Sequence, residues 1–474
     1  MQISPTTIAG LLIIDLDVHG DNRGWFKENW QREKMVAAGL PDFRPVQNNV
    51  SFNADAGVTR GLHAEPWDKL VSVAHGEVFG AWCDLRAGSA TFGEVVTCPI
   101  GPDRAVFVPR GVANGFQAQV ENTVYSYLVN DHWSPAAAYT AVSLDMIDWP
   151  LAPIEISDKD ATHPQLEAVQ PMLPRKILVT GADGQLGRAL RTVYGKATHV
   201  EFATRAEFDI TSPEIASARP WRQYQAIINC AAYNDVNGAE SDRAGAWAVN
   251  ATAPARLAAI AAEHNLTLVH VSSDYIFDGT CELHTEDELP SPLSVYGASK
   301  AAGDTAAQTA PKHYVFRTSW VFGEGANFIS TMAGLAERGI EPLVINDQRG
   351  RPTLAKDLAK AIVHLLESGA EYGVYNLSSS GDPVTRDEIA MAVFIATGHD
   401  PAKVHSVSTT DYQQYRIEQA ALHGDPTPAL EAPRPAESTF DLSKIEATGF
   451  KPSNWRAAVA LYVELDMPQT NASD

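Results

Sequence analysis

The amino-acid sequence predicts two domains of different class, an all-β domain followed by an α/β domain with a doubly wound parallel sheet. Three observations support this prediction. The chain has 474 residues, which favours two or three folding units. Short strand-like runs separated by turn residues fill its first part. After about residue 172, strand-like and helical runs alternate, which is typical of βαβ units.

The first part of the chain is predicted to be a β-sandwich or barrel. Its strand-like runs recur at short, regular intervals, and their separators are rich in Gly, Pro and Asp. The runs are Lys69–Val73, Glu77–Asp84, Gly93–Thr97, Ala105–Val108 and Thr123–Val129.

The second part is predicted to alternate between strands and helices. Strands are expected at Lys176–Thr180, Thr198–Ala203, Ala226–Asn229 and Leu266–Val271, and helices at Gln185–Tyr194 and Ala244–His264. Three prolines mark residues 164–174 as a linker. The predicted domains are therefore residues 1–163 and 175–474.

Charge and composition exclude several classes of protein. Lys and Arg number 36 against 58 Asp and Glu, a net charge of −22, which argues against nucleic-acid and anionic-membrane binding. A local basic pocket could still hold a small anion. The chain has no bilayer-spanning apolar run and no recognisable signal peptide. Its four cysteines form no CxxC pair, so we expect a cytoplasmic protein with reduced thiols.

A glycine-rich turn in the second part predicts a dinucleotide site. Gly181, Gly184 and Gly187 follow a predicted strand and open a predicted helix. In this context the glycines allow a tight turn, close approach of the backbone to a pyrophosphate, and close packing of helix on strand. The helix N-terminus adds free N–H groups for the phosphates. The alternative is a glycine-rich turn that binds nothing.

A Tyr–Lys pair predicts acid–base chemistry near this site. Tyr296 and Lys300 are four residues apart and share one face of a helix. We expect the ammonium to lower the pKa of the tyrosine, so that it exchanges protons near neutrality. Ser273 follows a predicted strand, at the sheet edge where ligands bind. An ordinary surface Tyr and Lys is the alternative.

The second part resembles the extended short-chain dehydrogenases/reductases, and among them the dTDP-4-dehydrorhamnose reductases. The resemblance rests on TGADGQLG, INCAAYNDVNGAE, VSSDYIFDG, PLSVYGASK, RTSWVFG, NDQRGRPT and RPAEST. It implies a small substrate-binding subdomain, and it implies that Tyr296 protonates the C4 oxygen while Lys300 holds the ribose and Ser273 completes a triad. The implied cofactor contacts also include Gly181, Gly184, Gln185, Leu186, Gly187, Asp209, Ile210, Ala231, Ala232 and Tyr233. Arg317 and Arg434 are candidate substrate contacts, with surface ion pairs as the alternative.

The cofactor is expected to be NADPH, although NADH is not excluded. An NAD site usually has an acidic residue at the end of the second strand. Here Thr204 and Arg205 follow that strand, and Arg205 could pair with a 2′-phosphate. The sequence does not determine whether Mg²⁺ acts in the reductase.

The candidate chemistry of the first part is Arg60 and His63, in the segment RGLH. A lone His is more often structural than catalytic. No HxH with a following Glu is present, so a metal centre is not expected.

The first part resembles the dTDP-4-dehydrorhamnose 3,5-epimerases, which are cupin-like double-stranded β-helices (jelly rolls) that need no metal. The resemblance spans residues 10–163 and rests on DNRGWFKE, QNNVSF, GVTRGLH, KLVSVAHGEVFGAWCDLR, FVPRGVANGF, SYLVNDHWSP, IDWPL and ISDKDA. It implies that His63 is a base oriented by Asp160 and that Tyr127 is the acid on the opposite side of the sugar. The implied substrate contacts are Arg23, Glu28, Gln47, Asn49, Arg60, Lys69, Asn114, Trp133 and Lys159.

This half departs from the epimerase pattern at three positions. Asn114 stands where the family usually has His, Ala138 where it has Glu, and Trp133 where it has Tyr. Asn114 can still donate a hydrogen bond to an enolate, and Trp133 can still stack on thymine.

Together the two resemblances predict a bifunctional enzyme of dTDP-L-rhamnose biosynthesis. It would epimerise dTDP-4-dehydro-6-deoxy-D-glucose at C3 and C5 and then reduce the C4 ketone. Two alternatives stay open: a reductase with a non-catalytic N-terminal binding module, and an enzyme that epimerises one centre of another keto-sugar nucleotide. We expect a homodimer through the N-terminal domain.

Overall fold

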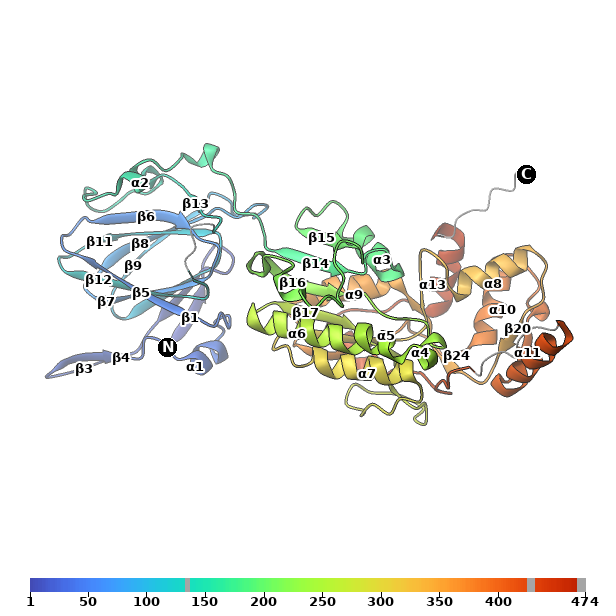
Figure 1. The fold of residues 1–474 in the computed structure, drawn as a ribbon. Coiled ribbons are helices and arrows are strands. Elements are labelled where there is room, and N and C mark those ends of the chain that lie inside the picture. Colours follow the sequence, from blue (N-terminus) through green and yellow to red (C-terminus); the bar gives the residue numbers. More distant parts are fainter. Residues whose placement is uncertain (133–136, 424–430, 467–474) are drawn as a thin grey trace. The chain divides into compact units, whose positions relative to one another are not determined.

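Two units make up the chain in the computed structural model, Met1–Pro174 and Arg175–Asp474 (Figure 1). The structure describes residues 1–132, 137–423 and 431–466. Within these ranges, every helix is too short or too polar to cross a membrane.

Unit 1 consists mainly of two antiparallel sheets. The six-stranded sheet has the order β1 (Gln2–Pro5), β2 (Leu12–Asp15), β10 (Arg104–Val108), β7 (Lys69–His75), β12 (Thr123–Val129) and β5 (Gln47–Asn53). The five-stranded sheet has the order β13 (Thr140–Ala141), β6 (Thr59–Ala64), β11 (Val112–Ala118), β8 (Val78–Asp84) and β9 (Val95–Ile100). The five strands predicted in this half all form, with small shifts at their ends.

The main core of unit 1 lies between these sheets. Val71, Val106 and Tyr125 contribute from the first sheet, and Trp82 and Phe116 from the second. Residues two apart on a strand share a face, so alternate positions of each strand enter this core. The residues on those inner faces that are not apolar are therefore placed to line any cavity between the sheets.

A hairpin and two short helices complete unit 1. They are β3 (Val18–Asp21), β4 (Gly24–Lys27), α1 (Arg32–Ala37) and α2 (Asp158–Ala161). The hairpin exposes Phe26, and the edge strand β5 exposes Val50 and Phe52, each by more than half of its surface. An exposed apolar edge of this kind is a candidate contact surface.

Residues 164–174, which we predicted to be a linker, pack on unit 1. Val169 and Met172 are buried in a second core of this unit. The Met172 N–H donates to the Leu85 carbonyl at 2.8 Å, and Met172 forms a bridge with Arg86. The prolines remove backbone donors but do not prevent these contacts.

Unit 2 contains a six-stranded parallel sheet. Its order is β15 (Val200–Ala203), β14 (Lys176–Thr180), β16 (Tyr224–Asn229), β17 (Thr267–Val271), β18 (His313–Thr318) and β23 (Gly373–Leu377). The order reverses at β14, and ligands bind at the carboxyl ends of strands beside such a point.

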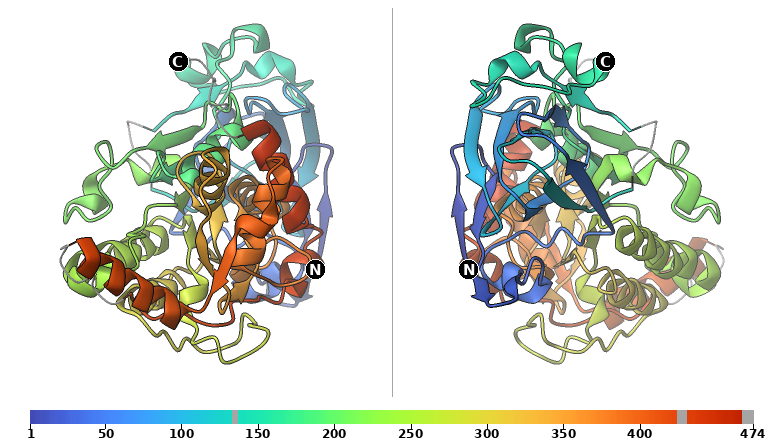
Figure 2. Two further views of the ribbon diagram at one scale, coloured as in Figure 1. Left: turned by 90° about the vertical axis from the view of Figure 1, so that its right-hand side faces the viewer. Right: turned by 90° about the vertical axis from the view of Figure 1, so that its left-hand side faces the viewer.

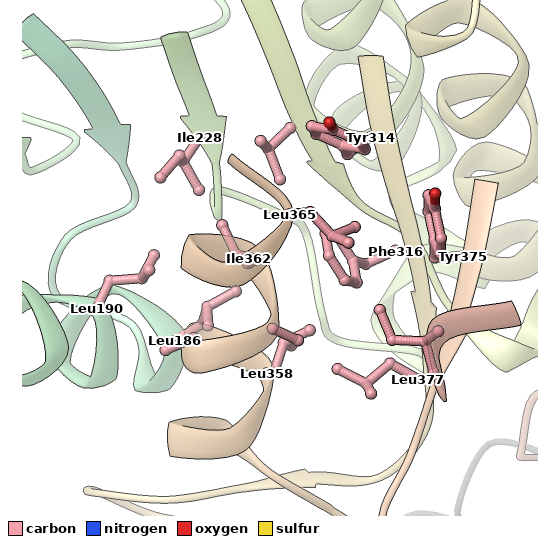
Figure 3. Close-up of a cluster of buried hydrophobic side chains, with 14 of the residues drawn as sticks. Leu186, Leu190, Ile228, Tyr314, Phe316, Leu358, Ile362, Leu365, Tyr375 and Leu377 are labelled. Carbon is pink, nitrogen blue, oxygen red and sulfur yellow. The ribbon is translucent and has the colours of Figure 1, made fainter. Parts of the chain in front are cut away.

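Helices cover both faces of this sheet (Figure 1). One face carries α3 (Gln185–Tyr194) and α9 (Ala355–Ser368), whose leucines and Ile362 pack on the strands in Figure 3. The other carries α6 (Ala253–Glu263) and α7 (Val295–Ala307). Neighbouring residues of a strand point to opposite faces of the sheet. Ile228 packs in the core with α3 and α9, and Ile227 packs in the core with α6. The doubly wound arrangement follows from this alternation.

The helix predicted at 244–264 is interrupted. The structure has α5 (Arg243–Trp247), a π-helical turn over Ala248–Thr252, and then α6. Pro254 has no N–H for the carbonyl of Asn250, four residues earlier, and this carbonyl lies against Gly303 of α7. The Asn250 side chain bonds both backbone groups of Tyr233. The turn thus ties the helix to the loop after β16.

A smaller subdomain with its own core completes unit 2. It includes α8 (Phe328–Glu337), α10 (Arg386–Ala396), α11 (Thr409–His423) and α13 (Trp455–Leu461), the orange to red helices at the front of the left-hand view in Figure 2. Short pairs join these segments: β19 (Val321–Phe322) with β22 (Thr353–Leu354), β20 (Leu343–Ile345) with β25 (His405–Val407), and β21 (Arg349–Gly350) with β24 (Val384–Thr385). The remaining helices of unit 2 are α4 (Gly238–Ser241) and α12 (Ser443–Ala447).

Candidate active sites

The first candidate site is a cavity of about 320 Å³ in unit 1, lined by residues of both sheets. It brings together residues that are distant in the sequence. Seven of the predicted site residues line it: Arg60, His63, Lys69, Asn114, Tyr127, Lys159 and Asp160.

A His–carboxylate pair forms one wall of this cavity. His63 lies on β6, and its Nε2 atom is 2.8 Å from Oδ1 of Asp160 on α2. The other carboxylate oxygen accepts from the Gly61 N–H at 3.2 Å, and the Asp160 N–H donates to Ser157 Oγ at 3.1 Å. The Asp160 carboxylate is therefore fixed. It contacts Nε2 of the imidazole and makes no contact with Nδ1, which sets the orientation of the ring.

The carboxylate of this pair stays ionised. Burial opposes its ionisation, but hydrogen bonds from His63, Gly61 and Ser157 outweigh burial and lower the pKa of Asp160 to about 2. A negative charge therefore adjoins His63 at neutral pH, and it would stabilise the imidazolium that forms when His63 takes up a proton.

A tyrosine and a lysine approach from the other sheet. Tyr127 is on β12, and Nζ of Lys69 on β7 lies 5.1 Å from its ring centre. Burial and the Glu65 carboxylate raise the pKa of Tyr127, while Arg60 opposes them. The phenol thus keeps its proton and is suited to act as an acid. Glu65 also holds Lys69, at 2.5 Å.

Asn114 occupies the wall beside the histidine. It lies directly opposite His63 in the β11–β6 pairing. Its Oδ1 accepts from Trp82 Nε1 at 2.9 Å and from the Tyr125 hydroxyl at 3.2 Å. An indole N–H can only donate, so the amide oxygen must face it, and the amide N–H groups face elsewhere. Asn114 is therefore a donor of fixed orientation at the cavity wall.

The second candidate site is a cavity of about 310 Å³ in unit 2, at the carboxyl ends of the parallel strands. Seven of the predicted residues line it: Gly184, Gln185, Leu186, Ala232, Ser273, Tyr296 and Lys300.

Two glycines of the loop at this cavity pack too closely against neighbouring backbone to carry a side chain. Gly181 has φ of +64°, and a Cβ there would lie 2.7 Å from the Ala231 nitrogen. A Cβ on Gly187 would lie 2.6 Å from Ala182 Cα. Gly184 precedes α3 and has no side chain to cap the helix, so N–H groups of its first turn remain for a ligand. These features fit the pyrophosphate of a dinucleotide.

The predicted Tyr, Lys and Ser meet beside this loop. Tyr296 and Lys300 are on α7, and Lys300 Nζ donates to the Val271 carbonyl at 2.6 Å. Ser273 follows β17, and its hydroxyl donates to Asp274 Oδ1 at 2.9 Å. Tyr275 packs edge-on against the Tyr296 ring, with centroids 5.7 Å apart.

The predicted effect of the lysine on the pKa of the tyrosine is wrong. Burial raises the pKa of Tyr296, a hydrogen bond with Ser273 opposes this, and Asp274 and Tyr275 add to it. Burial also lowers the pKa of Lys300 to about 8, against the influence of Asp304. Desolvation disfavours both charged forms, and it outweighs the attraction that the helix spacing predicted.

Comparison with known proteins identifies both units. Residues 175–467 match the family model of the RmlD substrate binding domain, and residues 5–168 match that of dTDP-4-dehydrorhamnose 3,5-epimerase. The chain belongs to both families. It is 51% identical to an RmlC homolog of Streptococcus pyogenes, over 36% of this chain and 91% of the relative.

The reductase half also matches known proteins over most of their length. It is 37% identical to a dTDP-4-dehydrorhamnose reductase of Mycobacterium tuberculosis, over 60% of this chain and 91% of the relative. A crystal structure of the Bacillus anthracis reductase in complex with NADP matches with a TM-score of 0.54 and 29% identity, over 60% of this chain and 97% of that one. Both resemblances expected from the sequence are thus confirmed, and one chain contains an epimerase domain and a reductase domain.

Four predicted substrate contacts lie outside the cavity of the epimerase domain. Arg23 is exposed and pairs with Asp21, and Glu28 pairs with Lys34. Gln47 and Asn49 bond each other on the edge strand β5. Trp133 lies outside the described residues. A single copy of the domain does not bring Arg23, Glu28, Gln47 or Asn49 to the cavity.

The predicted cofactor contacts beyond the glycine loop lie around the ends of β15 and β16. Arg205 follows β15, is exposed, and lies 3.9 Å from Asp209. Ile210 is buried in a core, and the Tyr233 N–H donates to Asn250. Ala231 adjoins Gly181 in the loop.

The two arginines predicted to contact substrate in the reductase domain do not line its cavity. Arg317 is buried, with Nε 3.0 Å from Asp304 Oδ2 and its guanidinium over the Phe277 ring. It forms an ion pair in the core, whereas the alternative interpretation from the sequence was an ion pair on the surface. Arg434 pairs with Glu431 at 2.8 Å.

The structure adds cavity residues that the sequence analysis did not select. Glu65 lines the epimerase cavity, and Asn234, Asp274 and Trp320 line the reductase cavity. Trp320 has φ of +46°, a strained value for a non-glycine residue. Polar residues just after the strands β16 and β17 could have been found from sequence, but Trp320 gave no such signal. His163, which lies beside His63 and Asp160, is another residue that the sequence analysis did not select.

Proposed function

We propose that this chain converts dTDP-4-dehydro-6-deoxy-D-glucose to dTDP-L-rhamnose in two steps. Residues 1–163 would epimerise C3 and C5, and residues 175–474 would reduce the C4 ketone. The observation that carries the proposal is the placement of His63 on one sheet and Tyr127 on the other, with a cavity between them. Inversion of a carbon needs a base and an acid on opposite sides of it.

The epimerase step depends on acidic hydrogens next to the C4 ketone. His63 would remove the hydrogen from C3 or C5, and the Asp160 carboxylate would stabilise the imidazolium. Tyr127, which burial keeps protonated, would return a proton from the opposite side. Lys69 and the oriented amide of Asn114 would stabilise the enolate oxygen. An amide supplies less positive charge than the His usual in the family.

The reductase step would use NADPH, which supplies hydride to C4. Support comes from the glycine loop and from the Bacillus anthracis relative, which is in complex with NADP. No acidic residue directly follows β15, and the exposed Arg205 there would pair with a 2′-phosphate. Tyr296 would donate the proton to the C4 oxygen, Ser273 would hold this oxygen, and Lys300 would hold the ribose.

We further propose that the epimerase domain is a cupin-like jelly roll and forms a homodimer. The two antiparallel sheets with a cavity between them support this fold. The exposed apolar residues Phe26, Val50 and Phe52 support the dimer. Arg23 and Glu28, which do not reach the cavity of their own domain, would then be free to contact the substrate of a second copy.

Deuterium incorporation tests the epimerase step. The purified protein is incubated with dTDP-4-dehydro-6-deoxy-D-glucose in D₂O without nicotinamide, and label at C3 and C5 is followed by NMR. We expect label at both carbons, and dTDP-L-rhamnose after NADPH is added. Label at one carbon would favour a single-centre epimerase. NADPH oxidation of a pre-epimerised substrate without label in the first experiment would favour a non-catalytic N-terminal domain.

A further inference from the structure

His163 is a buried histidine beside the catalytic pair that the proposed mechanism does not use. Its side chain is 6% exposed, neither ring nitrogen makes a well-formed hydrogen bond among the described residues, and the Gly61 backbone is a weak contact of the ring. Its ring meets that of His63 edge-on, with centroids 5.0 Å apart, and its Nε2 is 3.9 Å from Asp160 Oδ1. Buried polar atoms are as a rule well paired, so this weakly bonded imidazole has a ring nitrogen available for a ligand.

The three side chains bring one possible ligand atom each into a small region. These atoms of His63, Asp160 and His163 all lie within 4.8 Å of one another. Bonds of 2.0–2.2 Å in a tetrahedral zinc site place ligand atoms about 3.3 Å apart. The distances from Asp160 Oδ1, 2.8 Å to His63 and 3.9 Å to His163, lie on either side of this value. Small side-chain movements would therefore complete the geometry.

The backbone holds these ligands in place. Oδ2 of Asp160 is already bonded by the Gly61 N–H, which leaves Oδ1 to face the two imidazoles. His163 lies two residues after the end of the short helix that carries Asp160, and its N–H donates to the Asp160 carbonyl at 3.5 Å. The His63 side chain is 32% exposed and borders the cavity, so a fourth position would be open to water. Two imidazoles, a carboxylate and a water suit Zn²⁺.

We propose that His63, Asp160 and His163 form an inhibitory site for Zn²⁺ or a similar divalent transition metal, which switches off the epimerase cavity. The inhibitory part rests on the function proposed above. Metal on Nε2 of His63 uses the lone pair there and displaces the ring proton to Nδ1. Both nitrogens are then occupied, and the imidazole has no lone pair left to accept a proton from the sugar. The Asp160 oxygen that would stabilise the imidazolium is occupied as well.

Metal binding is tested first, without any sugar. The metal-free full-length protein is titrated with Co²⁺ and followed by visible absorption, and Zn²⁺ is then added in competition. We expect one Co²⁺ per chain, displaced by Zn²⁺. His163→Gln should weaken binding at least about tenfold, because one of three protein ligands is lost. The control is His405→Gln, which removes a histidine from an exposed pair with Glu341.

Two further measurements keep the test decisive. X-ray absorption of the parent protein with one equivalent of Zn²⁺ should show two imidazole ligands, which needs no variant to fold. Stoichiometric Zn²⁺ should stop deuterium exchange in the parent, with recovery on chelation, and leave reduction of a pre-epimerised substrate unchanged. His163→Gln should need at least about ten times more Zn²⁺ for half inhibition.

The outcomes separate the site from the function. Absence of stoichiometric binding, or equal affinity in His163→Gln and the parent, would overturn the site. Binding with full exchange activity would overturn the inhibitory role. If the metal-free parent shows no exchange at all, the proposed epimerisation fails, while the cobalt and X-ray measurements still decide the site.

Discussion

Asp160→Asn isolates the contribution of the carboxylate in the epimerase cavity. The substitution keeps the size of the side chain but removes its charge and turns one acceptor oxygen into a donor. In the parent, one oxygen faces Nε2 of His63 at 2.8 Å and the other faces the Gly61 N–H at 3.2 Å. An asparagine cannot accept both hydrogen bonds.

Each orientation of the new amide has a cost that follows from these contacts. With its oxygen toward His63, its NH₂ group faces the Gly61 N–H, and a buried donor is left unpaired at about 1–3 kcal/mol. The developing imidazolium also loses its counter-charge. With the NH₂ toward His63, the ring proton must sit on Nδ1, and the base is lost. We expect a barrier higher by about 3–5 kcal/mol, a rate loss of about 10²- to 10⁴-fold.

Exchange of deuterium into C3 and C5 measures this loss directly. Asp158→Asn is the matched control, because Asp158 is an exposed carboxylate on the same short helix. Reduction of a pre-epimerised substrate by the same preparation reports whether the rest of the chain is intact. Exchange by Asp160→Asn within about threefold of the parent, with reduction unchanged, would refute the role given to the carboxylate.

Three other predictions concern both cavities. Tyr296→Phe should slow reduction by about 10²- to 10⁴-fold while NADPH still binds. Single-turnover absorbance measures the reduction rate, and NADPH fluorescence measures binding. Unchanged turnover would contradict the role of Tyr296 as the proton donor. Asn114→Asp keeps the hydrogen bonds from Trp82 and Tyr125 but places a negative charge beside the enolate. Deuterium exchange at C3 and C5 should therefore fall at least about tenfold, and a faster exchange would contradict the role given to Asn114. Burial lowers the pKa of Lys300 from 10.5 to about 8, so between these values the unfolded chain holds a proton that the folded one has lost, and raising the pH stabilises the fold. This gain, up to about 3 kcal/mol, should be absent in Lys300→Met when urea unfolding is compared at pH 7 and pH 10, and an equal gain in both proteins would argue against it.

Local patterns in the sequence were sufficient for the parts of the protein that depend on neighbours along the chain. Periodicity located five strands of unit 1 and four of unit 2, because alternation between buried faces is a local signal, but it did not select β6 and β11, which carry His63 and Asn114. The spacing of Gly181, Gly184 and Gly187 predicted the loop before α3, since the turn itself demands residues without a Cβ. The motif matches predicted both families, and the comparisons confirmed them.

Local patterns failed where a distant contact decides the outcome. Three prolines predicted a linker over residues 164–174, but Val169 and Met172 in this segment pack in a core of unit 1. The helix over 244–264 is interrupted where Asn250 bonds Tyr233, a partner outside the helix. The spacing of Tyr296 and Lys300 on α7 predicted a lowered pKa for Tyr296, but burial among the surrounding elements raises this pKa instead.

The sequence by itself determined which residue types are available for each reaction, and the motifs predicted catalytic roles for His63, Tyr127, Tyr296 and Lys300. The tertiary structure alone decided which of them meet. It placed His63 and Tyr127 on opposing sheets, moved Arg317 into a core ion pair, and brought His163 beside His63 and Asp160. The physical reason is that charge, burial and hydrogen bonding depend on through-space neighbours, which chain spacing does not specify.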